Sequence, residues 1–555
     1  MLKISQLFKR KTLREDAVAG LVLGVESVPD GLAGGLLAGV NPIFGLYGYM
    51  MGTVTGALFT SSAFMAVQAT GAMAIVVADV GAVHSAEDPG RALFTLSILT
   101  GVVMIAAGLL KLGKILRFVS NAVMVGFINA VGVNIILGQL DNFTGYEASG
   151  GNRVSRAFDL LLHFWEVHFP TVLIGVVTIA LILILEKTRL GPLGMVVAVV
   201  AGSAIVPLFG WEVMQLNDIA DIPRSLPLPV LPDFGIAFEL IIPAFALAFV
   251  GLVQGAGISA NFPNPDGDYP DPSEDFVGQG AANVVAGVFQ GMPVGGSMSA
   301  SSLVKNAGAK SRTALVVASA VMAVVVLVFG GVVGQIAMPA LAGLLMTVGY
   351  RTIKPEDIKA VWKTGLPQAV VMTVTFALTM VIPLQNAVLV GVGISVIMLT
   401  IEKSNEVKIK RLVRNDDGEI FESDPPETVP ANEVVALNPY GSLFFAAAPL
   451  FEEQLPDVLP ESTNSVVILR LRGRSDVGTT FMDVLYRYGE ALNDVGSRLV
   501  IVSASEHLLE QLTVTGVNDV VGEDGIYMTE RKLGAALVSA YNDGQAWILA
   551  NRNGG

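Results

Sequence analysis

The chain has 555 residues, of which 52% are hydrophobic and 15% charged, and its mean hydropathy is +0.63. Soluble domains carry about 25% charged residues, so this composition indicates a polytopic membrane protein. The absence of cysteine and the four scattered histidines exclude thiolate chemistry and argue against a metal site, a cofactor or an enzyme. A net charge of −14 argues against a nucleic-acid partner.

Fourteen segments are apolar enough to lie in a bilayer, after a basic end at 1–16 that we expect to be cytoplasmic. Nine approach the span of about 20 residues that a membrane helix needs. These lie at 17–39, 43–59, 92–110, 118–138, 170–185, 192–209, 236–258, 313–336 and 384–401. Five are shorter or interrupted, and lie at 64–83, 277–290, 297–308, 338–349 and 367–382. The whole of 17–402 is therefore predicted to be a transmembrane domain.

Lysine and arginine concentrate after the even-numbered segments. Lys111 follows the fourth segment, Lys187 the sixth and Lys305 the tenth. Because cytoplasmic loops are enriched in Lys and Arg, both termini are predicted to be cytoplasmic in a plasma (inner) membrane.

The third and tenth segments occupy corresponding places if the spans form two halves of seven. Both are short and interrupted by glycine, and Pro293 and the Gly295–Gly296 pair break the tenth. Matched broken segments predict the central site of a transporter, with two half-helix N-termini facing each other at mid-membrane. Such N-termini attract anions.

Neutral donors surround the predicted site. Gln68, Thr70, Ser297 and Ser299 lie at the two breaks, so we expect them to contact a small anion. Under an alternative interpretation, these glycines and serines only allow close helix packing.

Ionisable residues within apolar segments are functional suspects. Glu26 or Asp30 would carry a co-transported proton; the alternatives are an interhelical hydrogen bond or a water-facing carboxylate. Asp79 is expected to be solvated at the outer end of the third segment. Lys305 is either a membrane anchor or part of an exit path.

The composition changes after the last span. Residues 403–432 are charged and contain proline, and we interpret them as a cytoplasmic linker. Strand and helix patterns alternate in 433–545, which predicts a small α/β domain, and 546–555 form a tail.

Several motifs resemble the sulfate permease (SulP) family, which includes the animal solute carrier family 26 anion exchangers. They are VPDGLA at 28–33, LAGVNP at 37–42, GLY at 45–47, GQGAAN at 278–283, GMPVGGSMS at 291–299 and NAGA at 306–309. The C-terminal domain resembles the STAS domain of these proteins. The resemblance implies fourteen segments as 7+7 inverted repeats (UraA-like), a substrate site between segments 3 and 10, a core domain rocking against a gate domain, and a homodimer.

Three departures from the family affect the mechanism. Ala300 stands where many members place an arginine, and Gln254 stands where many bacterial members place a glutamate for coupling. Ile258 replaces a further acidic residue of bicarbonate carriers, so sodium coupling is doubtful.

The sequence therefore predicts a secondary transporter of small anions that works by alternating access. Sulfate is the default substrate, and bicarbonate, chloride or a dicarboxylate such as fumarate would also fit. The predicted binding residues are Gln68, Thr70, Gly71, Ala72, Gly296, Ser297, Ser299 and Ala300. The rival interpretations are a nucleobase permease of the same fold and a membrane sensor that signals through the STAS domain without flux.

Overall fold

The structure is a computed structural model that describes residues 12–112, 120–188, 190–220, 222, 224–382, 384–415, 419–471, 477–532 and 534–552. The predicted N-terminal end is therefore described only from Thr12, and the predicted tail only to Arg552. The chain forms two compact units, Met1–Ser395 and Val396–Gly555. Each unit is described by itself.

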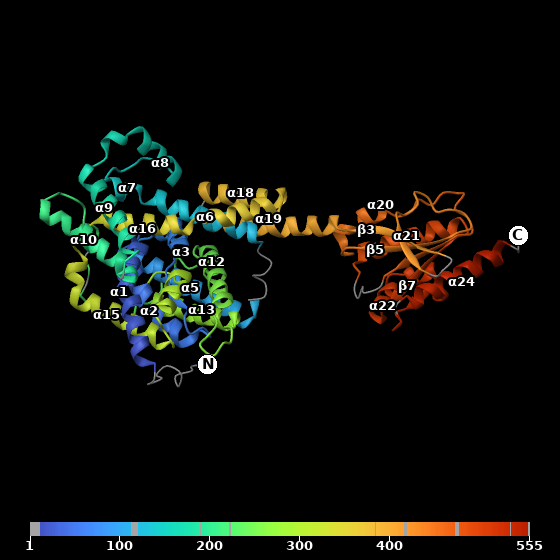
Figure 1. The fold of residues 1–555 in the computed structure, drawn as a ribbon, viewed down its shortest axis with the longest axis horizontal. Helices are drawn as coiled ribbons and strands as arrows, with labels where there is room; N and C mark the ends of the chain where they lie inside the picture. The colour runs from blue at the N-terminus through green and yellow to red at the C-terminus, as the bar shows by residue number, and fades with distance from the viewer. Residues whose placement is uncertain are drawn as a thin grey trace. The chain divides into compact units, whose positions relative to one another are not determined.

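The first unit is helical, and a helix lies at each of the fourteen predicted segments (Figure 1). The membrane-segment helices are α1 (Leu13–Leu37), α2 (Pro42–Phe59), α3 (Gly71–Ala78), α5 (Pro89–Leu109), α6 (Asn121–Gly138), α9 (Phe169–Leu185), α10 (Gly194–Phe209), α12 (Ile241–Asn261), α13 (Pro272–Val288), α14 (Met298–Asn306), α15 (Thr313–Val333), α16 (Met338–Thr352), α18 (Leu366–Val381) and α19 (Leu384–Asn405). The last of these, α19, continues into the second unit.

Shorter helices connect these segments. They are α4 (Gly81–His84), α7 (Leu140–Thr144), α8 (Arg153–Leu162), α11 (Leu216–Ile219) and α17 (Pro355–Thr364). Among the described residues, five helical stretches are long and apolar enough to cross a membrane, at α1, α5, α6 with α7, α12 and α15. Helices α9, α10 and α18 are shorter but also apolar.

The helices of the first unit pack as two groups. In the first helix group, α1 to α5 pack with α12 to α15, and in the second, α6 to α10 pack with α16 and α18. Glycine allows close approach within the first group: a Cβ atom on Gly101 would lie 2.5 Å from the carbonyl oxygen of Gly280, and one on Gly280 would lie 2.6 Å from that of Gly101. The groups meet where α3 contacts α6 and where α1 contacts α10 and α16.

The second unit is built on a six-stranded sheet of order β4-β3-β5-β6-β7-β8. The β3 strand runs antiparallel to β4 and β5, and the remaining pairs are parallel. The strands are β3 (Lys408–Arg414), β4 (Ile420–Ser423), β5 (Val434–Tyr440), β6 (Val466–Arg470), β7 (Arg498–Ala504) and β8 (Ile526–Met528). The helices are α20 (Ala448–Glu453), α21 (Thr479–Asp494), α22 (Glu506–Val514), α23 (Val517–Val521) and α24 (Ala535–Arg552).

The stretch that we interpreted as a linker contains two of these strands. Both β3 and β4 fall within 403–432, and β3 pairs with β5. The charged residues that suggested a linker are tolerated because β4 is an edge strand whose side chains are all exposed.

Candidate anion site

Two three-residue strands join the broken segments. The strands β1 (Ala66–Gln68) and β2 (Gly295–Ser297) pair antiparallel, with Gln68 opposite Gly295 and Ala66 opposite Ser297. Each strand leads into a helix: β2 continues directly into α14, and β1 reaches α3 after Ala69 and Thr70. Because the strands are antiparallel, β1 leads into α3 at the end of the pair where Gly295 lies, and β2 leads into α14 at the end where Ala66 lies. The two helices therefore start at the two ends of one short strand pair and run in opposite directions.

The first residue before each helix caps it with a side-chain hydroxyl. Thr70 Oγ1 accepts a hydrogen bond of 3.3 Å from the Met73 amide, and Ser297 Oγ accepts one of 3.4 Å from the Ala300 amide. These caps satisfy only one of the free amides at each helix start.

Four backbone N–H groups at the two helix starts remain available. Among the described residues, no partner is found for the amides of Gly71 and Ala72 on α3, or of Met298 and Ser299 on α14. Each helix start also carries about half a positive charge from the aligned peptide dipoles. The arrangement therefore offers an anion several donors and a positive potential from the backbone of the described residues alone.

Glycine holds this site against α12. A Cβ atom on Gly295 would lie 2.9 Å from Gly251 Cα, and one on Gly296 would lie 2.8 Å from Gly255 Cα. Any side chain at either position of β2 would push the strand away from α12. These glycines therefore allow close helix packing, as the alternative interpretation expected, and they also hold β2 in place at the proposed site.

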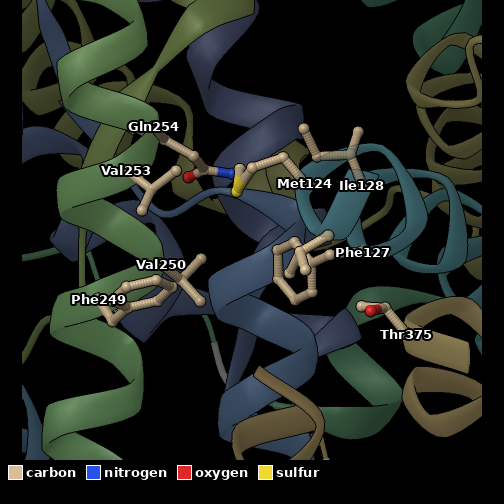
Figure 2. A pocket seen from close by; sticks show the side chains of 9 residues that line it. Met124, Phe127, Ile128, Phe249, Val250, Val253, Gln254 and Thr375 are labelled. Carbon is tan, nitrogen blue, oxygen red and sulfur yellow. The ribbon is translucent and has the colours of Figure 1, made fainter. Parts of the chain in front are cut away.

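Gln254 extends from α12 to the start of α3. Thr70 Oγ1 donates a hydrogen bond of 2.9 Å to Gln254 Oε1. The Gln254 amide nitrogen has no hydrogen-bond partner within the described part of the chain. Figure 2 shows the Gln254 side chain pointing from α12 toward Met124. The residue predicted as a coupling position is therefore a neutral donor beside the helix starts.

The side chain of Gln68 faces away from the helix starts. Its amide nitrogen donates to Ser27 Oγ at 2.9 Å and to Thr53 Oγ1 at 3.3 Å, and the residue is buried. Both of its N–H groups are thus engaged with α1 and α2, and Gln68 fixes the position of β1.

The serines on α14 differ in exposure. Ser299 is exposed and its Oγ lies 3.2 Å from Ser297 Oγ, whereas Ser297 and Ala300 are buried. Ser299 therefore presents both an amide and a hydroxyl to the space in front of α14.

Two polar residues of α13 support the tenth segment, and our sequence reasoning did not select them. Gln279 Oε1 accepts a bond of 2.9 Å from the Gly296 amide, while Asn283 bonds both backbone polar groups of Val294. Both side chains are buried. Their spacing of four residues in an apolar segment is the signal that could have identified them, because it places both on one helix face.

The two carboxylates of α1 have different surroundings. Asp30 Oδ2 accepts a bond of 2.7 Å from Tyr49 OH, which is the interhelical hydrogen bond considered above. Glu26 is partly buried one turn earlier, and the described residues offer it no hydrogen bond.

Asp79 is not solvated, and that expectation was wrong. It lies at the end of α3 with 18% of its side chain exposed, and Arg153 of α8 bonds it at 2.9 Å. The sequence could not indicate this pair because the partners are 74 positions apart. The pair ties the first helix group to the second.

Lys305 lies at the far end of α14 between two aromatic rings. Its Nζ is 4.8 Å from the ring centroid of Phe262 and 5.9 Å from that of Phe64. Cation–π contacts of this kind hold the charge near the end of the tenth segment. In the described part of the chain, no cluster of three His, Asp or Glu side chains could hold a metal ion.

Comparison with known proteins gives a consistent result. The family model described as the sulfate permease family matches residues 13–375, and the STAS domain model matches 425–533. The bicarbonate transporter BicA of Picosynechococcus is 27% identical over 429 residues, which cover 75% of each chain. Sulfate transporter 4.1 of Arabidopsis thaliana is 22% identical over 541 residues, or 92% of this chain and 78% of its own.

A solved structure extends the comparison to the fold. The murine solute carrier 26 family member A9 anion transporter, in its inward-facing state, aligns with a TM-score of 0.81 and 19% identity. The alignment covers 96% of this chain and 91% of that chain. The predicted fold, a helical multi-pass membrane unit followed by an α/β STAS domain, is confirmed.

Proposed function

Because the chain belongs to the sulfate permease family, a family of membrane anion transporters, we propose that it carries a small inorganic or carboxylic anion by alternating access. Sulfate is the first candidate substrate, since several relatives are named for it, and bicarbonate is the next. Chloride and a dicarboxylate such as fumarate are further candidates. The proposed site lies between α3 and α14.

The observation that carries this proposal is the pair of helix starts at the two ends of the β1–β2 strand pair, with four available amides. An anion between them would accept hydrogen bonds from Ala72 and Ser299 and would be stabilised by both helix dipoles. Since no arginine follows Ser299, a neutral site of this kind holds the anion weakly enough to release it. Gln68, Gly296 and Ala300 support the site through β1, β2 and the α14 cap.

Alternating access requires the first helix group to move against the second. The site lies on the first group, at its contact with α6. We propose that the Asp79–Arg153 pair stabilises one of the two end states, in which the outer ends of α3 and α8 are joined. Opening on that side would break the pair.

Loss of this pair should shift the transporter toward the state that is open on the Asp79 side. A partly buried ion pair contributes about 1 kcal/mol, so Asp79→Asn should raise the open population about fivefold. The chain has no cysteine, so a single cysteine at Met124 can report access without background. Its rate of labelling from outside should rise in Asp79→Asn and return when Asp79→Arg is combined with Arg153→Asp. An unchanged labelling rate would refute the proposal that the Asp79–Arg153 pair stabilises one end state.

The coupling ion is part of the proposal. Glu26 has no hydrogen-bond partner among the described residues, so it is the better candidate for a co-transported proton, and Asp30 is already bonded to Tyr49. Gln254 and Ile258 leave no carboxylate on that part of α12 for sodium. Exchange of one anion for another is the alternative. We further propose a homodimer in the plasma membrane, with both termini cytoplasmic.

The rival functions make different demands on the site. A nucleobase permease needs carboxylates to bind the base N–H groups, whereas backbone donors and serine hydroxyls occupy this site. A sensor that signals through its STAS domain would bind an anion without flux.

Uptake into proteoliposomes tests the proposal. Labelled sulfate, bicarbonate and fumarate are compared with and without proton and sodium gradients. Saturable uptake of one anion supports transport, and its response to a proton gradient supports coupling through Glu26. Binding without flux for every anion would favour the sensor.

A further inference from the structure

An apolar pocket lies beside the proposed site, between the two helix groups (Figure 2). Three helices line it: α6 and α18 of the second group and α12 of the first. The lining residues are Val123, Met124, Phe127, Ile128, Phe249, Val250, Val253, Gln254 and Thr375. Gln254 belongs both to this pocket and to the start of α3, because it bonds Thr70.

The pocket offers almost no polar groups. None of its lining side chains is charged, and the Thr375 hydroxyl already donates to the Val371 carbonyl at 2.8 Å. Gln254 is thus the one lining side chain whose N–H groups have no partner among the described residues. Small inorganic anions are strongly hydrated, so contact with apolar side chains does not stabilise them. A hydrocarbon group, in contrast, is stabilised when such side chains remove it from water.

We propose that the substrates of this transporter include monocarboxylates with a hydrocarbon or aromatic body. The carboxylate would lie beside the Gln254 amide at the helix starts, and the body would lie against the apolar side chains of Phe127 and Phe249. This inference rests on the proposed function, because it assigns the substrate class of the same site. It makes Phe127 a specificity-determining residue.

The position of the pocket gives the body a role in transport. Phe127 lies on α6 and Phe249 on α12, so a bound hydrocarbon contacts both helix groups at once. Such contacts change when the groups move, and a ligand that prefers one arrangement shifts the equilibrium toward it. Acetate, which has only a methyl group, would lack most of this contact.

Calorimetric titration of the purified full-length protein tests the inference. Acetate, butyrate and benzoate are titrated, with 1-butanol as the uncharged control. Burial of each methylene should tighten binding by about fourfold, so butyrate should bind more than tenfold more tightly than acetate. The alcohol should not compete. Equal affinities for acetate, butyrate and benzoate would overturn the inference.

Two variants locate the body in the pocket. Phe127→Ala should weaken benzoate binding about tenfold and leave acetate unchanged, while Val253→Phe should fill the pocket and exclude benzoate alone. Phe329→Ala, at an exposed position of α15, is the matched control. Equal effects of Val253→Phe on acetate and benzoate would overturn the assignment even if Phe127→Ala failed to fold.

The result is separable from the proposed function. If sulfate or bicarbonate is taken up but acetate, butyrate and benzoate bind with equal affinity, this inference is refuted and anion transport still holds. An absence of flux for every inorganic and organic anion would refute the proposed function itself.

Discussion

Replacement of Ser299 by tryptophan is expected to abolish anion uptake while the protein still folds. Ser299 is the second residue of α14, its side chain is exposed, and its amide is one of the four available donors. An indole there would occupy the space in front of the α14 start without disturbing a packed core. We expect uptake to fall at least about 100-fold, equivalent to about 2.7 kcal/mol of lost transition-state stabilisation.

The control for this variant is Ser302→Trp, one turn further along α14. Ser302 accepts a bond from Asn306 and is not at the helix start. It should retain most of the uptake, and both variants should elute from a sizing column at the wild-type volume. Wild-type uptake by a well-folded Ser299→Trp protein would show that the anion is bound elsewhere.

The largest loss of stability is expected for Asp275→Ala. Asp275 is buried near the start of α13, where Oδ1 accepts bonds of 2.6 and 3.2 Å from the amides of Ser61 and Ser62. Its Oδ2 accepts a bond of 2.6 Å from Ser259 Oγ. Alanine would leave two amides unsatisfied, at about 1–3 kcal/mol each, so the free energy of unfolding should fall by about 3–5 kcal/mol.

Thermal unfolding in detergent can measure this effect. Glu274→Ala is the matched control, because Glu274 is the preceding carboxylate, is exposed and accepts no hydrogen bond from the described residues. It should unfold within a degree or two of the wild type. Equal unfolding temperatures for the two variants would show that the Asp275 network does not hold the fold.

Asp16, in the other half of the chain, likewise accepts hydrogen bonds from backbone amides of a distant segment. It is buried near the start of α1, and its Oδ1 accepts bonds from the amides of Lys310 and Ser311. Asp275 thus holds the chain that leads into β1, and Asp16 holds the chain that follows α14. Each half of the molecule therefore fixes the broken segment of the other half.

The sequence predicted the two chain breaks and the helices that restart after them, because backbone chemistry determines both. Pro293 and the two glycines after Val294 cannot continue a helix, and Thr70 and Ser297 are residues that cap a new one. Any membrane protein must protect such broken backbone from lipid, so the break also predicted a central location.

Other features depend on contacts between distant parts of the chain. The side chain of Gln68 bonds Ser27 and Thr53 of neighbouring helices, and no local pattern indicates that direction. The Asp79–Arg153 pair likewise depends on how the two helix groups meet. The β3–β4 hairpin was not predicted because its polar outer residues resemble those of a linker.

The most direct test of the central claim is protection of a single cysteine by the anion. The natural chain has no cysteine, so Ser299→Cys provides one thiol at the start of α14. A transported anion should slow its modification by a charged thiol reagent at least about fivefold, and should leave a Ser302→Cys control unchanged. If the anion is transported yet both thiols react at the same rate with and without it, the site between α3 and α14 is contradicted.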